Sequence, residues 1–110
     1  MKYLVDATKM KAIDEHTSKM IGIPSLVLME KAAMEIVEVM RLKITKKDRI
    51  LAVCGTGNNG GDGIATIRML KELGYDADVL IIGDEKRATD QMKQQLIIAR
   101  NLDVKVYNKY

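Results

Sequence analysis

A glycine-rich stretch between an apolar strand and an apolar-periodic helix constrains this chain more than any other feature. Residues 50–54 are predicted to form the strand, and five of the nine residues that follow are glycine. Gly55, Gly57 and Gly60 match the pattern G-x-G-x-x-G, after a strand and before a helix as a dinucleotide-binding turn requires. Glycine leaves no Cβ between the backbone and a ligand, so peptide N–H groups can approach a phosphate. A tight turn without a ligand is the alternative, and these three glycines alone do not decide between the two.

The length and composition indicate one ordinary globular domain. The chain has 110 residues, of which 30% are charged and 47% hydrophobic, and its formal net charge is +3. That charge is too small to indicate a nucleic-acid or membrane partner by itself, and no apolar run approaches the ~18 residues of a membrane span. The first residues also lack the apolar core of a signal peptide. We therefore expect a cytoplasmic protein that binds neither nucleic acid nor membranes.

The only cysteine and the only histidine are both expected to have structural roles. A single cysteine, Cys54, excludes an internal disulfide and a cysteine-based zinc cluster. Because it ends an apolar strand, we expect a buried and unreactive thiol. His16 falls on an expected N-terminal helix among charged neighbours, which favours a surface position over the role of a base.

The hydrophobic periodicity predicts a Rossmann-like α/β domain spanning residues 1–110. Residues 1–48 are expected to form an N-terminal helical layer, with a short strand or extended arm at 1–5 and helices at 8–21 and 25–42. The rest alternates strand, helix, strand, helix and strand, at 49–54, 61–73, 77–82, 90–101 and 102–107, which favours a parallel sheet with right-handed crossovers. The continuous apolar run at 79–82 is typical of a strand buried on both faces. We expect a three-layer sandwich whose sheet stops after its third main strand.

The two residues that follow Gly60 exclude a P-loop. A P-loop needs Lys followed by Ser or Thr directly after its second spaced glycine, and Gly61 and Asp62 stand in those places. ATP hydrolysis of that type is therefore excluded. A hydride-transferring dehydrogenase stays open, because Asp84 or Glu85 follows the second main strand at about the position of a ribose-binding acid.

The polar residues inside the glycine stretch indicate a more specific ligand. Asn58 and Asn59 supply amide oxygens and N–H donors side by side, which suits a polar ligand or a hard monovalent cation. Asp62 is placed in the first turn of the expected helix, where a carboxylate is favoured by the helix dipole. Asp62 can therefore either cap the helix or form a hydrogen bond with a ligand, and the sequence leaves both interpretations open.

Three stretches of the chain resemble one known family. Gly-Thr-Gly-Asn-Asn-Gly-Gly-Asp-Gly at 55–63 is similar to the signature loop of the YjeF N-terminal domain family, the NAD(P)HX epimerases. Met-Lys-Ala-Ile-Asp-Glu at 10–15 and Gly-Ile-Pro-Ser-Leu-Val-Leu-Met-Glu-Lys-Ala-Ala at 22–33 also agree with that family. Together the matches span almost all of residues 1–83 in the family's order, so the resemblance is specific.

The resemblance implies a Rossmann-like fold and the repair of hydrated nicotinamide dinucleotides. Epimerases of this family interconvert the R and S forms of NAD(P)HX, so that a dehydratase acting on the S form can restore NAD(P)H. Carried over by position, Asn58, Asn59, Gly60, Gly61 and Asp62 would bind this substrate, and Asn59 would also help to coordinate a potassium ion. Whether NADHX or NADPHX is preferred is left open.

The family continues for about as long again beyond the third main strand. A second substrate loop, an acidic ligand of the ion and the proton-transferring residue lie there, so we expect this chain to carry half of the site and assign no catalytic residue. We also expect no strand beside the free edge of residues 50–54, and hence a homodimer that covers this edge or the adjoining helix faces.

Two other functions stay open besides the epimerase. The first is a non-catalytic nucleotide-binding or dimerisation scaffold of the same family, as in decapping-enhancer proteins. The second is an ordinary NAD dehydrogenase, which is the less favoured of the two because it leaves the two asparagines and Asp62 without a role.

Overall fold

The computed structural model describes residues 2–4 and 22–109, which form a four-stranded parallel sheet and helices packed against it. Its elements follow the order β1 (Lys2–Leu4), α2 (Ser25–Arg41), β2 (Arg49–Cys54), α3 (Asn58–Glu72), β3 (Asp76–Ile82), the 3₁₀ turn η1 (Glu85–Arg87), α4 (Asp90–Asn101) and β4 (Val106–Lys109). The strands lie side by side in the order β1-β2-β3-β4, and every pairing is parallel. The predicted α/β fold with a parallel sheet is confirmed.

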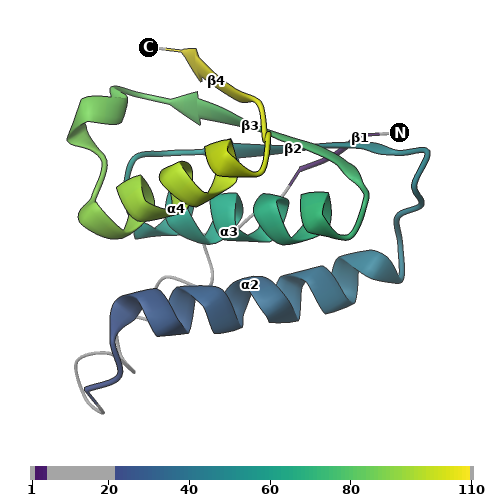
Figure 1. Cartoon of the computed structure of the whole chain (residues 1–110), viewed down its shortest axis with the longest axis horizontal. Helices are drawn as coiled ribbons and strands as arrows, with labels where there is room; N and C mark the ends of the chain where they lie inside the picture. The colour runs from purple at the N-terminus through teal and green to yellow at the C-terminus, as the bar shows by residue number, and fades with distance from the viewer. Residues whose placement is uncertain (1, 5–21, 110) are drawn as a thin grey trace.

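Helices α3 and α4 cover one face of the sheet, and α2 packs beneath them against α3 (Figure 1). Alternate residues of the two central strands point into this layer, and they are buried together with apolar side chains of α3 and α4: Ile50, Ala52, Cys54, Ala77, Val79, Ile81, Ile64, Ile67, Leu70, Met92, Leu96 and Ala99. The core is therefore built mainly by the strand–helix–strand–helix–strand unit that the sequence predicts, and α2 adds Val37 to it.

Most boundaries agree with the sequence pattern. Helix α2, strands β2 and β3 and helix α4 match their predicted ranges to within a residue. Thr89 caps α4, because its side-chain oxygen accepts a hydrogen bond from the backbone N–H of Met92. The helix expected at 8–21 lies outside the described residues.

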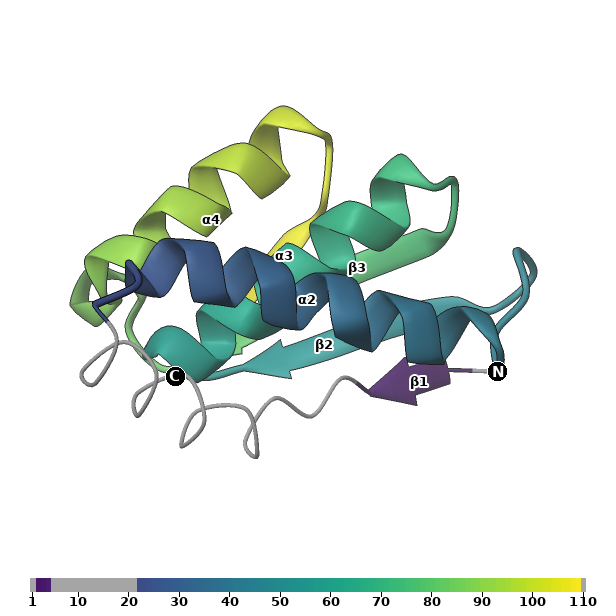
Figure 2. The same ribbon diagram turned by 90° about the horizontal axis from the view of Figure 1, so that it is seen from below.

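The free edge of β2 is not bare, which corrects one prediction. Strand β1 pairs in parallel with the first half of β2, in the register Lys2↔Arg49, Tyr3↔Ile50 and Leu4↔Leu51 (Figure 2). The expectation of an unpaired edge overlooked the first residues of the chain, which can reach the sheet because parallel pairing needs no adjacency in sequence. No described strand pairs with the last half of β2 on that side, at residues 52–54.

The last strand begins later than its alternating pattern predicts. Residues 102–105 do not belong to β4, because residues 102–104 end helix α4 and Lys105 leads from this turn to β3, whose Val79 N–H bonds to the Lys105 carbonyl at 3.0 Å. Asp103 takes a left-handed conformation with φ of 63°, and the backbone N–H of Val104 bonds to the carbonyl of Ala99 at 3.0 Å. This is the helix-ending motif in which glycine is usual. The prediction was wrong here because an aspartate at that position gives no clear stop signal.

No described helix covers the second face of the sheet (Figure 1). Across the strands, Val53 lies beside Leu80, and Leu80 lies beside Tyr107. Val53 and Tyr107 are 43% and 50% exposed, and Ile82 farther along β3 is 45% exposed. The apolar run of β3 is thus buried on one face only, against the sequence prediction. Within the described part of the chain, no helix is long and apolar enough to cross a membrane.

Candidate functional site

The glycine loop lies where β2 ends, and helix α3 begins inside it. The helix starts at Asn58 with Gly57 as its N-cap, three residues before the predicted start at Gly61 or Asp62. Asparagine and glycine are unfavourable in the interior of a helix. They are tolerated in the first turn, because its N–H groups have no hydrogen-bond partners within the helix. Both asparagines and the next two glycines therefore form the first turn of α3.

The side chain of Asn58 joins the starts of three helices. Its Nδ2 donates to Ser25 Oγ, the first residue of α2, at 3.1 Å. Its Oδ1 accepts from Thr89 Oγ1, the N-cap of α4, at 2.7 Å. Figure 1 shows α2, α3 and α4 beginning at the same end of the molecule. Because each helix start carries a partial positive charge and unsatisfied N–H groups, this end of the molecule favours an anion.

The glycines of the loop fall into two groups by what surrounds them. A Cβ built on Gly55 or Gly57 would meet no atom of the described residues within 4 Å, and neither residue has a positive φ. A Cβ on Gly60 would lie 2.1 Å from the Gly55 carbonyl oxygen, and one on Gly63 would lie 2.8 Å from Cys54 Sγ. Packing therefore requires glycine at positions 60 and 63. The fold itself does not require it at positions 55 and 57.

The five residues that the resemblance assigns to substrate lie close in sequence but differ in exposure. Asn58 and Asn59 are half-buried, whereas Gly60, Gly61 and Asp62 are buried, Asp62 with 2% of its surface exposed. Asn59 Oδ1 is fully buried, and no hydrogen-bond partner reaches it from the residues that the structure describes. A buried amide oxygen without a donor is the kind of atom that a cation can satisfy.

The thiol beneath the loop is inert. Cys54 is 3% exposed, and burial raises its pKa to about 12. A thiol with this pKa stays protonated at neutral pH, and the thiolate is the reactive species. This agrees with the buried structural role predicted from the sequence.

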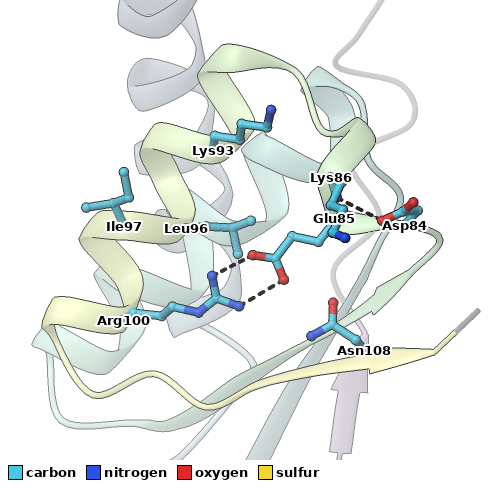
Figure 3. Close-up of a pocket in the computed structure, with 8 residues that line it drawn as sticks. All are labelled: Asp84, Glu85, Lys86, Lys93, Leu96, Ile97, Arg100 and Asn108. Atoms are coloured by element: carbon cyan, nitrogen blue, oxygen red, sulfur yellow. Dashed lines mark hydrogen bonds and ion pairs between the residues drawn. The ribbon is translucent and has the colours of Figure 1, made fainter.

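The acidic residues behind β3 are already engaged within the chain. Asp84 caps η1, because its carboxylate accepts from the backbone N–H of Lys86 at 3.0 Å. Glu85 forms two hydrogen bonds with the Arg100 guanidinium, at 2.6 and 2.9 Å, and these bonds lower the pKa of the Glu85 carboxyl (Figure 3). Both border a groove of about 700 Å³ along α4. Their local partners account for them without a ribose, which weakens the dehydrogenase alternative.

Two sets of polar residues were missed by reasoning from the sequence. Ser25 and Thr89 were not predicted to contact the loop, although both hydroxyls meet Asn58. Glu30 was not predicted to have a role in the fold either, yet it accepts hydrogen bonds from Arg68 of α3 and, at 2.7 Å, from Gln95 of α4. These contacts join residues 31 to 65 positions apart, so no local pattern announces them.

The fold and the loop define the class of protein. A parallel sheet with a glycine loop between its first main strand and the following helix is the arrangement of a Rossmann-type α/β domain. The model of the family described as YjeF-related protein N-terminus matches residues 25–110, and the chain belongs to this family.

Curated relatives carry one name. A protein of Weissella koreensis is 42% identical over 105 residues, which cover 96% of this chain and 48% of the relative, and one of Levilactobacillus brevis is 40% identical over 106 residues, which cover 96% and 49%. Both are named NAD(P)H-hydrate epimerase. This chain thus spans about half the length of the curated relatives that it matches.

A solved structure supports the same fold. The crystal structure of yeast ynu0, YNL200c, superimposes with a TM-score of 0.74 at 29% sequence identity. The alignment covers 96% of this chain and 47% of the yeast chain. The arrangement of strands and helices described above is therefore that of one half of a larger known fold.

Proposed function

We propose that this chain supplies the glycine-loop half of an NAD(P)H-hydrate epimerase site and binds hydrated NAD(P)H there. The observation that carries the proposal is the open space in front of Gly55 and Gly57. Neither packing nor backbone conformation explains glycine at these positions, whereas close approach of a phosphate to the backbone does. The names of the relatives supply the substrate class. The converging starts of three helices supply the positive potential that a pyrophosphate requires.

Potassium is the cation that we propose for the buried oxygen of Asn59. Among the described residues no group of three His, Cys, Asp or Glu side chains could hold a metal ion, so a carboxylate-rich divalent site is not offered there. Asn59 Oδ1 is a neutral oxygen that lacks a donor, and rings of carbonyl oxygens hold potassium in proteins. One such ligand fits the ion but does not complete its coordination. The bound ion would supply positive charge beside the loop.

The remaining parts of the proposal concern the setting of the reaction. As the family resemblance implies, we propose that the proton-transferring group comes from residues equivalent to the second half of the relatives. The epimerised product would serve a dehydratase that accepts one epimer. We propose a cytoplasmic location for this repair reaction, where NAD(P)H is used.

Replacing Gly57 with serine separates ligand binding from folding. Serine is a favoured N-cap residue, and Gly57 has the extended conformation of an N-cap with φ of −91°, so Gly57→Ser should leave the unfolding temperature unchanged or raise it. Its Cβ would occupy the space in front of the loop. We expect the affinity for hydrated NADPH, measured by calorimetry on the 110-residue chain, to fall about ten-fold.

The same titration tests the cation. Wild-type affinity should be higher in potassium chloride than in lithium chloride at equal ionic strength, and Asn59→Ala should remove this difference. Unhydrated NADP⁺ serves as the comparison ligand. Equal affinity of wild type and Gly57→Ser would show that the ligand does not approach the loop. Absence of binding by the wild-type chain in potassium would refute the proposed function for this chain.

Self-association is a second proposed property, and the open face of the sheet favours it. Parallel sheets occur almost only with both faces covered, and a groove of about 300 Å³ on this face is lined in part by Leu51, Leu80 and Tyr107. We propose that a second copy covers this face in a homodimer of the 110-residue chain. This property also fits the scaffold alternative, which needs no catalysis.

A charge placed on the open face should break the dimer. We expect sedimentation equilibrium at micromolar concentration to give a dimer for the wild type and a monomer for Val53→Asp. Val39→Asp is the matched control, because Val39 is 56% exposed on helix α2 and off the sheet. Dissociation by Val39→Asp alone would place the interface on the helices, and a monomeric wild type would refute the proposal.

A further inference from the structure

Both ends of the Asn58 side chain are engaged within the protein. An asparagine oxygen can accept two hydrogen bonds and its NH₂ group can donate two. Here the oxygen accepts from Thr89 Oγ1 at 2.7 Å, and the NH₂ group donates to Ser25 Oγ at 3.1 Å. The Thr89 hydroxyl is likewise used twice, since it also accepts from the backbone N–H of Met92 at 3.2 Å. We call this chain of contacts through Ser25, Asn58 and Thr89 the Asn58 bridge.

The bridge fixes the glycine loop at two points. The backbone N–H of Thr89 donates to the carbonyl of Thr56 at 3.0 Å, and the side chain of Thr89 holds Asn58. Gly57 lies between these two attachments. Open space lies in front of this part of the loop. The orientation of the Gly57 N–H group is therefore set from both sides by Thr89, the N-cap of α4.

We propose that Thr89, together with Ser25, is a positioning residue for the loop, and that Asn58 acts through this bridge rather than as a direct ligand of the substrate. The proposal rests on the proposed function, because the loop that it holds is the part assigned to hydrated NAD(P)H. Its physical basis is preorganisation: backbone donors that are already aimed at an anion need no rearrangement when the anion binds. The three residues come from three helices, so the bridge also sets how α2 and α4 sit relative to α3.

Asparagine suits this role better than the chemically similar residues aspartate and serine. Aspartate could accept from both hydroxyls but would place a negative charge where an anion is to bind, and a serine is too short to reach both Ser25 and Thr89. Thr89 is also separable from its backbone contact. Thr89→Val removes the hydroxyl but keeps the N–H that holds Thr56, whereas Thr89→Ser keeps both.

The test compares variants of the 110-residue chain with hydrated NADPH as the probe. Thr89→Val should weaken affinity about ten-fold, the typical size of one lost hydrogen bond in a fixed site. Thr89→Ser should restore affinity to within about two-fold. Gln94→Gly is the matched control. Gln94 is an exposed residue of α4, and its replacement by glycine destabilises the helix by about as much as a lost cap without touching the bridge. Its affinity should equal that of the wild type.

A double substitution tests whether Asn58 and Thr89 act as one unit. If Asn58 acts through Thr89, Asn58→Ala combined with Thr89→Val should bind as weakly as Asn58→Ala alone. Fold-losses that multiply would show that the two residues act independently and would overturn the proposal. Equal weakening in Gln94→Gly and Thr89→Val would also overturn it, because loss of stability alone would then explain the effect.

A measurement without ligand keeps the inference separate from the proposed function. The backbone amide NMR signals of Gly55 and Gly57 should shift in Thr89→Val and Ser25→Ala, and should keep their wild-type positions in Gln94→Gly. If the wild-type chain binds no hydrated NADPH, the proposed function fails while these signals still decide whether the bridge orients the loop. Unchanged loop signals in Thr89→Val would refute the positioning role whether or not the ligand binds.

Discussion

Gly60→Ala is expected to lower the free energy of unfolding by about 3 kcal/mol or more, a large share of the stability of a domain of this size. Alanine at an ordinary helix position would instead stabilise by about 1 kcal/mol relative to glycine. The sign is reversed because the added Cβ would lie 2.1 Å from the carbonyl oxygen of Gly55 and 3.0 Å from its carbonyl carbon. Both are backbone atoms at the end of β2, and they cannot turn away as a side chain can.

Two other glycine substitutions provide the controls. Gly55→Ala meets open space, so we expect a change within about 0.5 kcal/mol, as for a surface substitution. Gly61→Ala would bring its Cβ to 2.7 Å from the Cε of Met29, the far end of a flexible side chain, and should fall between the two. Urea unfolding of the three variants measures the order. A Gly60→Ala chain as stable as Gly55→Ala would mean that α3 and β2 do not approach as closely as described.

These substitutions also show how far the sequence alone could describe the site. The pattern of glycines predicts a tight strand-to-helix connection, and the structure confirms that Gly60 lies against the end of β2. The same pattern does not tell which glycines are needed for packing and which leave space. That distinction depends on how closely α3 approaches the Gly55 carbonyl and the Cys54 thiol, which only the three-dimensional structure shows.

Local signals predicted the elements well, and long-range contacts account for what was missed. The apolar strand Arg49–Cys54 and the Thr89-capped helix Asp90–Asn101 were predictable, because each is specified by its own residues. The pairing of β1 with β2 and the contacts of Asn58 were not, since both join segments far apart in the chain. The turn at Asp103 was missed for a different reason: a left-handed aspartate resembles an ordinary strand residue in sequence.

Arg68→Met is expected to lower the free energy of unfolding by about 2 to 3 kcal/mol, a little less than for a fully buried ion pair. The Arg68 guanidinium binds Glu30 of α2 through both carboxylate oxygens and Glu72 of its own helix at 3.1 Å. The Arg68 side chain is only 11% exposed, and that of Glu30 is 35% exposed. Methionine would keep most of the buried stem of Arg68. The loss therefore reflects a Glu30 carboxylate whose remaining hydrogen-bond partner, among the described residues, is Gln95 of α4.

The Glu85–Arg100 pair is the matched control for this prediction, because it has the same chemistry at the surface. Its side chains are 31% and 45% exposed, so Arg100→Met should cost less than about 1 kcal/mol. Equal losses in the two variants would show that water screens both pairs alike and that burial of Arg68 adds nothing. Changing both members of the Glu30–Arg68 pair to methionine should recover part of the loss, since an apolar contact then replaces an unpaired charge, although buried Gln95 loses its acceptor. That recovery would assign the cost of Arg68→Met to the isolated carboxylate rather than to altered packing between α2 and α3.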